Sequence, residues 1–153
     1  MARDDFRCAH KLRVRWAEVD MQKVVFNAHY LTYIDTAIAE YWREIGLGYP
    51  DGYVDRYAAD MFLRKATVEY LGSARYDDLL SVLCRVAALG RSSMTMRFEV
   101  WRDEPAHASP LVTAELVYVN VGVGTMRPEP LPDDLRRRVR DYEGPRMVPH
   151  EGS

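Results

Sequence analysis

The fold is decided by one stretch of the chain, which reads Val14-Arg-Trp-Ala-Glu-Val-Asp20-Met-Gln-Lys-Val-Val-Phe-Asn27-Ala-His29-Tyr-Leu-Thr-Tyr-Ile-Asp-Thr-Ala-Ile-Ala-Glu-Tyr-Trp-Arg43. Apolar and basic side chains alternate around its beginning, which predicts a half-buried strand from about His10 to Ala17. Apolar side chains then recur at helical spacing, which predicts a helix from about Ala28 to Ile45, ~27 Å long. Gly46 stands where the C-cap glycine of that helix would lie.

The loop between the predicted strand and helix has chemical content. Asn27 is a favoured N-cap residue, so we predict that the helix begins there and presents unpaired backbone N–H groups. Such donors stabilise the negative charge that develops on a carbonyl oxygen under attack. Asp20, on the same loop, can serve as a nucleophile or activate a water. On the spacing alone, however, Asp20 is more simply explained as a turn residue.

Three sequence blocks resemble the hot-dog-fold acyl-CoA thioesterases of the 4-hydroxybenzoyl-CoA thioesterase type. The blocks are Asp20-x-x-x-Val24-Val25-Phe26-Asn27-x-His29-Tyr30-Leu31-x-Tyr33, Val68-Glu-Tyr-Leu-Gly-Ser-Ala-Arg-Tyr-Asp77-Asp78-Leu, and Arg127-Pro-Glu-Pro-Leu-Pro132. They occur in the family's order over roughly residues 10 to 140. The resemblance implies an α+β hot-dog fold, in which a curved antiparallel β-sheet wraps around one long central α-helix.

The first block departs from the family pattern at three positions. Lys23 replaces the usual loop glycine, so the loop backbone is expected to differ. Asn27 and His29 stand where the family more often has His and Asn. A role of the family's histidine side chain therefore cannot be moved to Asn27, whereas a role of the backbone N–H can.

The resemblance also implies the site. The backbone N–H of Asn27 would polarise a thioester carbonyl, and Asp20 would attack it or activate a water; the sequence leaves both routes open. We expect His29, Val25 and Phe26, from the same motif, to contact the substrate. The turn Arg91-Ser92-Ser93 is a candidate for binding coenzyme A phosphates, although an ordinary turn explains it equally well.

Composition sets the limits on other functions. The chain has 153 residues, 29% of them charged, and a net charge of −2, which gives no basic excess for nucleic acid. We predict one domain over residues 1–142 and a flexible tail over 143–153. No apolar run is long enough to cross a membrane, and the charged N-terminus lacks a signal-peptide pattern, so we expect a cytoplasmic protein without membrane insertion.

Other chemistry finds little support in the sequence. Four scattered histidines show no metal-ligand spacing, and we predict neither a metal site nor a cofactor other than coenzyme A within the substrate. Cys84 lies in an apolar strand pattern without a nearby base, so we expect a buried residue and not a nucleophile. Glu18 shares a strand face with Asp20 but is expected to face solvent.

The remainder of the chain predicts four more strands and one helix. Strand patterns occupy residues 61–70, 79–89, 93–102 and 111–121, and short connections favour antiparallel pairing. Residues 132–141 have acids first and arginines later, the charge order of a helix. The four arginines of this predicted helix either bind a phosphate or nucleic acid or, as we prefer, form a solvent-exposed face of the helix. The resemblance implies a homodimer or homotetramer, and Met94, Met96 and Phe98 could serve that interface or the core.

These observations predict an acyl-CoA thioester hydrolase that depends on Asp20. The alternative is a non-catalytic acyl-CoA or lipid-binding module on the same fold, for which the departures at Lys23 and His29 leave room. A hot-dog dehydratase ranks last, because those proteins rely on a catalytic histidine in a different setting.

Overall fold

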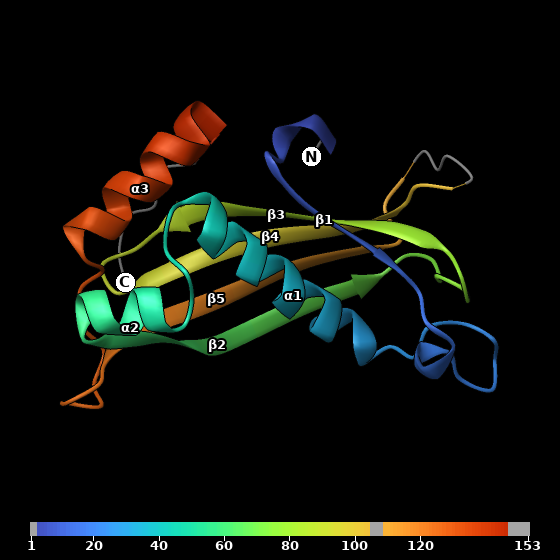
Figure 1. Cartoon of the computed structure of the whole chain (residues 1–153), viewed down its shortest axis with the longest axis horizontal. Helices are drawn as coiled ribbons and strands as arrows, with labels where there is room; N and C mark the ends of the chain where they lie inside the picture. Colours follow the sequence, from blue (N-terminus) through green and yellow to red (C-terminus); the bar gives the residue numbers. More distant parts are fainter. Residues whose placement is uncertain (1–2, 105–108, 147–153) are drawn as a thin grey trace.

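Five antiparallel strands form one sheet, and a single long helix crosses its concave face (Figure 1). The computed structural model describes residues 3–104 and 109–146. The sheet order is β1-β3-β4-β5-β2. Its strands are β1 (Cys8–Arg13), β2 (Ala59–Tyr70), β3 (Leu79–Leu89), β4 (Ser93–Arg102) and β5 (Val112–Gly122). The helices are α1 (His29–Glu44), α2 (Asp51–Tyr57) and α3 (Asp133–Glu143), with 3-10 turns η1 (Arg3–Asp5), η2 (Trp16–Glu18) and η3 (Gly144–Arg146). The predicted α+β class, an antiparallel sheet around one long helix, is confirmed.

The apolar stripe of α1 supplies one half of the core. Ile34, Ala37 and Tyr41 are fully buried against the sheet. Met94 and Met96 of β4 are also fully buried, in the same core, and Phe98 is nearly so. Each large apolar side chain buried in this way contributes roughly 1.5–3 kcal/mol. These three β4 residues therefore belong to the core of one chain and not to an interface.

The first strand is shorter than predicted. It ends at Arg13, and the chain turns into η2, which leaves the Trp16 side chain 75% exposed. The end coincides with that of its partner, because β3 begins at Leu79, opposite Arg13, and only Val14 still exchanges backbone hydrogen bonds with Asp77 and Asp78 beyond it. The alternating pattern continues past this point in the sequence and gives no sign of the change.

The central helix begins one residue later than predicted. Its first residue is His29 and its N-cap is Ala28, so the prediction that Asn27 caps the helix is wrong. No side chain caps this end. At the other end, Gly46 has φ of +83°, the left-handed conformation expected of a glycine just beyond a helix.

One helix was not predicted, and another is longer than predicted. Helix α2 has no counterpart among the predicted elements, and the hydroxyl of its buried Tyr53 donates to Asn120 at 2.7 Å. Helix α3 extends past residue 142 to a fully buried Glu143, which accepts hydrogen bonds from the Tyr41 hydroxyl and the Val86 N–H. Most of the predicted tail, residues 147–153, lies outside the described residues.

Strand β2 forms one edge of the sheet and has no strand on its outer side. Six consecutive residues in its middle are exposed, and they include Phe62 (48%) and Leu63 (51%). Long apolar edge strands of this kind are templates for pairing with another chain. Within the described ranges, none of the helices is long and apolar enough to span a membrane.

Candidate active site

The loop that leads into α1 is a short hairpin with Asp20 near its tip. Val19 pairs with Val25, and Val24 pairs with Arg75 beyond β2. The Asp20 N–H donates to the Val24 carbonyl at 2.9 Å, and one carboxylate oxygen, Oδ1, accepts the Gln22 N–H at 2.8 Å. The second oxygen, Oδ2, has no hydrogen-bond partner among the described residues. Asp20 also lines a surface hollow of about 810 Å³, so that oxygen is open to a ligand.

Lys23 occupies the tightest point of this loop. Its φ is +66°, in the left-handed region that glycine adopts without strain. The Lys23 N–H donates to the Asp20 carbonyl at 2.9 Å, which closes the turn. The residue that replaces the family's glycine thus takes up a glycine-like conformation, at a cost of about 1–2 kcal/mol.

The backbone N–H of Asn27, just before α1, is not used in a hydrogen bond among the described residues. The Phe26 N–H donates to the Glu18 carbonyl at 3.0 Å, and the Phe26 carbonyl accepts the His29 N–H at 2.9 Å. The Asn27 carbonyl accepts the Tyr70 hydroxyl at 3.2 Å. By contrast, the N–H of Asn27 donates to no acceptor in the described part of the chain. An oriented N–H without a partner, one turn from a helix N-terminus, is suited to stabilise developing negative charge on a carbonyl oxygen.

Glu18 is buried, which corrects the expectation that it faces solvent. It is 8% exposed and accepts hydrogen bonds from the Arg15 backbone N–H (2.8 Å), the Arg15 side chain (3.0 Å) and the Tyr33 hydroxyl (2.9 Å). Burial alone would raise the pKa of this carboxyl, but the hydrogen bonds from Arg15 and Tyr33 outweigh it, and the net pKa is lowered. Glu18 therefore stays charged while it joins the loop to the helix.

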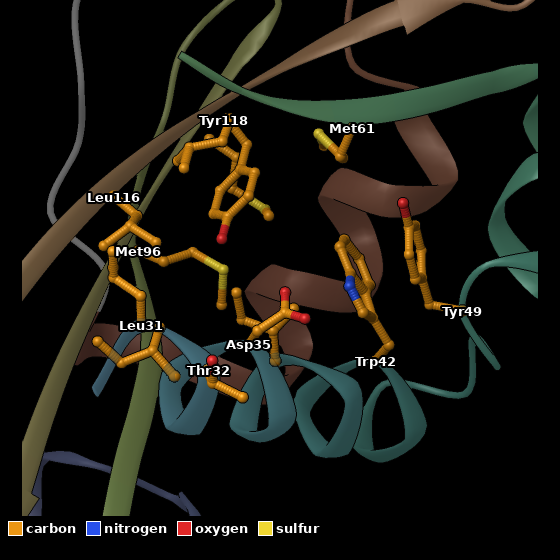
Figure 2. A pocket seen from close by; sticks show the side chains of 13 residues that line it. Leu31, Thr32, Asp35, Trp42, Tyr49, Met61, Met96, Leu116 and Tyr118 are labelled. Atoms are coloured by element: carbon orange, nitrogen blue, oxygen red, sulfur yellow. The ribbon is translucent and has the colours of Figure 1, made fainter. Parts of the chain in front are cut away.

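An apolar cavity of about 470 Å³ lies between α1 and strands β2, β4 and β5 (Figure 2). It begins at Leu31, one helical turn beyond Asn27, and extends along the helix to Trp42. Its polar lining residues include Thr32 and Tyr49. Two more are Asp35, which projects from α1, and Tyr118, whose hydroxyl points toward the cavity from β5 (Figure 2). Burial and then the Asp35 charge raise the pKa of Tyr118. Neither side chain has a hydrogen-bond partner within the described residues.

The comparisons with known proteins agree with this geometry. A family model described as the thioesterase superfamily matches residues 22–109, more than half of the chain. The chain belongs to the thioesterase superfamily. The match includes the start of α1 and begins two residues after Asp20.

Individual thioesterases are similar over most of their length. An acyl-CoA thioester hydrolase, YbgC of Escherichia coli, is 28% identical over 124 residues, 81% of this chain and 89% of that protein. A Thermus thermophilus thioesterase, solved with coenzyme A and Zn, is 28% identical with a TM-score of 0.77, covering 92% of this chain and 97% of that one. A 1,4-dihydroxy-2-naphthoyl-CoA thioesterase from Synechocystis, 18% identical with a TM-score of 0.77 (90% and 98% covered), shares the fold. The predicted hot-dog fold and the predicted family are thereby confirmed.

The remaining candidate residues of this thioesterase-superfamily chain lie in three different settings. Phe26 is 47% exposed, and its ring lies edge-on to that of the half-buried His29. Val25 is 4% exposed and belongs to the core. The turn of residues 91–93 lies at the opposite end of the sheet from Asp20, because β3 runs from the Asp78 corner to that turn. There, Ser93 is buried and Arg91 is exposed.

The arginines of α3 and the cysteines have structural roles. Arg136 donates to the Gly90 carbonyl, and Arg138 donates to the Ile45 carbonyl at the end of α1, so two of the four predicted surface arginines hold α3 in place. Cys84 is fully buried opposite Cys8 in the β1–β3 ladder, and burial raises its pKa well above the usual value. Its thiol therefore stays protonated. The described residues contain no group of three potential metal ligands.

Replacing Lys23 by glycine is expected to stabilise the protein by about 1 kcal/mol, because the left-handed strain disappears while the turn hydrogen bond remains. Lys23→Ala keeps a Cβ and is the matched control, with no comparable gain. Chemical denaturation of the three proteins measures the difference. An equal gain in both variants would mean that the side chain, and not the backbone conformation, is the source of the strain.

Glu18→Gln is expected to lower stability near neutral pH by about 1–3 kcal/mol. Because the folded-state pKa of Glu18 lies below its ordinary value of 4.5, its contribution is complete above that pH and is lost as the pH falls. The unfolding free energies of the wild type and the variant should therefore converge between about pH 5 and pH 3. A difference that stayed constant over this range would show that Glu18 is not stabilised as a carboxylate.

Proposed function

We propose that this protein is an acyl-CoA thioester hydrolase, in which Asp20 and the backbone N–H of Asn27 act on the thioester carbonyl. The observation that carries the proposal is the unpaired Asn27 N–H, held by its neighbours on the hairpin that also presents a free oxygen of Asp20. Membership of the thioesterase superfamily and the acyl-CoA thioester hydrolase relative support the substrate class.

The proposed reaction needs only groups of this chain and water. The Asn27 N–H donates to the carbonyl oxygen and stabilises the negative charge that forms on it. Either the Asp20 carboxylate attacks the carbonyl carbon, expels the thiolate of coenzyme A and forms a mixed anhydride that water hydrolyses, or Asp20 takes a proton from the attacking water. Both routes give a carboxylic acid and the free thiol, and both depend on the same oxygen of Asp20.

The cavity beside α1 is the proposed acyl site. Its volume is in the range of small-molecule sites, and it begins one turn from the proposed carbonyl-binding N–H. His29 lies between that N–H and the cavity along the chain, and Phe26 directly precedes Asn27, which agrees with their proposed contact with the substrate. Three of the residues on its sheet side are methionines (Met61, Met94 and Met96), whose flexible side chains can adapt to the acyl group.

A homodimer or homotetramer is part of the proposal, with two β2 strands paired antiparallel. Tyr70, at one end of β2, contacts Asn27, whereas Met61, near the other end, pairs with Asn120, whose N–H donates to Ser92. A two-fold partner would therefore bring its own end with Arg91, Ser92 and Ser93 toward the Asp20 end of the first copy. Within one chain these ends are ~35–40 Å apart, since β2 spans 12 residues. In this pairing, Arg91, Ser92 and Ser93 of one copy would bind the coenzyme A of a substrate held at the Asp20 end of the other copy. We also propose that the enzyme is cytoplasmic.

Asp20→Asn is expected to abolish hydrolysis of acyl-CoAs, with a loss of at least about 100-fold in kcat, because the amide is neither a nucleophile nor a base. Asn27→Ala is the matched control and should keep most of its activity, since the proposed donor is a backbone group. The assay measures the thiol released from a panel of acyl-CoAs of different length and polarity. Full turnover by Asp20→Asn would contradict the mechanism, and binding without turnover by the wild type would favour a non-catalytic acyl-CoA-binding module.

The edge pairing predicts that the protein sediments at twice the chain mass or more. Phe62→Lys combined with Leu63→Lys should shift it toward the monomer, because both side chains are exposed on the edge strand and charges there oppose pairing. Analytical ultracentrifugation measures the mass, and circular dichroism checks that the double variant is folded. A wild-type protein that sediments as a single chain at all concentrations would contradict the proposed pairing.

A further inference from the structure

We propose that Glu18 is a positioning residue for thioester hydrolysis, which holds the Asp20 hairpin and the Asn27 N–H at a fixed separation. The inference rests on the proposed function, and it assigns a role to a residue that the sequence placed in solvent. Its basis is a set of hydrogen bonds that meet at this one residue from three segments of the chain: η2, the end of the hairpin and α1.

The carboxylate of Glu18 connects the hairpin to the helix. One oxygen, Oε1, accepts both the Arg15 N–H at 2.8 Å and the Tyr33 hydroxyl at 2.9 Å, and the other, Oε2, accepts Arg15 Nε at 3.0 Å. Tyr33 is 4% exposed and lies on the buried face of α1, so its hydroxyl is fixed by the core. The hydrogen bond from Tyr33 therefore fixes the position of η2 relative to α1.

The backbone of Glu18 connects the same point to the proposed carbonyl-binding peptide. Its carbonyl accepts the Phe26 N–H at 3.0 Å, and Phe26 immediately precedes Asn27. In the other direction along the chain, Glu18 is followed by Val19, which pairs with Val25, and then by Asp20. Asn27 is thus the neighbour of a residue whose N–H Glu18 holds, and Asp20 lies two residues after Glu18 in the chain.

The helix offers an internal comparison for this role. A second buried tyrosine of α1, Tyr41, donates to the buried carboxylate of Glu143 at 2.8 Å, in the C-terminal half of the same helix. The two pairs have the same chemistry and nearly the same length, and both tyrosines are buried. They differ in location: only the Tyr33–Glu18 pair adjoins the hairpin. An effect on the reaction that is specific to Tyr33 therefore reports on position and not on helix stability.

The experiment compares kcat and KM of the wild type, Tyr33→Phe, Tyr41→Phe, Glu18→Ala and Glu18→Gln, with Asp20→Asn in the same assay. A displacement of about 1 Å can cost on the order of 100-fold in rate. We expect kcat to fall on the order of 10-fold in Tyr33→Phe and about 100-fold in Glu18→Ala, with KM changed less than about twofold. Glu18→Gln keeps an oxygen that accepts one of these donors and should recover most of the lost kcat.

The control variant Tyr41→Phe distinguishes an effect on the position of the site from a general loss of stability. Tyr41→Phe is expected to lower the melting temperature about as much as Tyr33→Phe does, while its kcat stays within about twofold of the wild type. Equal losses of kcat in the two tyrosine variants, or full kcat in Glu18→Ala, would overturn the positioning role. Activity retained by Asp20→Asn would instead refute the catalytic role proposed for Asp20, and absence of hydrolysis in the wild type would refute the proposed function.

A second measurement tests the positioning role without turnover. Hydrogen exchange of the Phe26 amide reports directly on its bond to the Glu18 carbonyl. This amide should exchange at least about 10-fold faster in Tyr33→Phe than in Tyr41→Phe, measured under conditions where both are folded. Unchanged protection in Tyr33→Phe would show that the Glu18 side chain does not hold the peptide, whatever the substrate of the protein is.

Discussion

The structure depends on the burial of one face of α1 against the concave face of the sheet. Once Ile34, Ala37 and Tyr41 are buried, the helix cannot slide or rotate without exposing them, because cores pack at crystal-like density. The position of the helix N-terminus follows from this packing. The location of the proposed site is therefore set by apolar contacts made about one to three turns further along the helix.

Hydrogen bonds of buried tyrosines add to the apolar packing in holding α1 on the sheet. Three tyrosines of α1 are engaged through their hydroxyls: Tyr30 accepts the Ala74 N–H at 3.0 Å, Tyr33 donates to Glu18, and Tyr41 donates to Glu143. Each reaches a different neighbouring segment, so the helix is anchored at two points in its first two turns and at one point near its end. A buried polar group that loses its partner costs about 1–3 kcal/mol, so each of these hydrogen bonds stabilises the packed position of the helix.

The sequence predicted those parts of the structure in which apolar periodicity coincides with burial. The strands of the sheet and the central helix follow such patterns, and Gly46 marks the helix end as predicted. The prediction failed where long-range contacts decide the local structure. The strand ends at Arg13 because its partner β3 begins opposite it, at Leu79. Glu18 is buried because Arg15 and Tyr33 donate hydrogen bonds to its carboxylate. Glutamate is rarely buried without partners, and the sequence does not reveal these partners.

The departures of the first motif from the family pattern concern side chains, whereas the proposed chemistry uses the backbone. Lys23 adopts the left-handed conformation of the glycine it replaces, so the hairpin keeps its turn hydrogen bond at some cost in strain. The exchange of Asn27 and His29 leaves a backbone N–H at the same place. A site built on a backbone donor tolerates such exchanges only if the peptide itself is held, because no side chain can compensate for its displacement. The buried Glu18, outside the family's motif, meets that requirement here, since its own carbonyl holds the peptide and its carboxylate holds the helix.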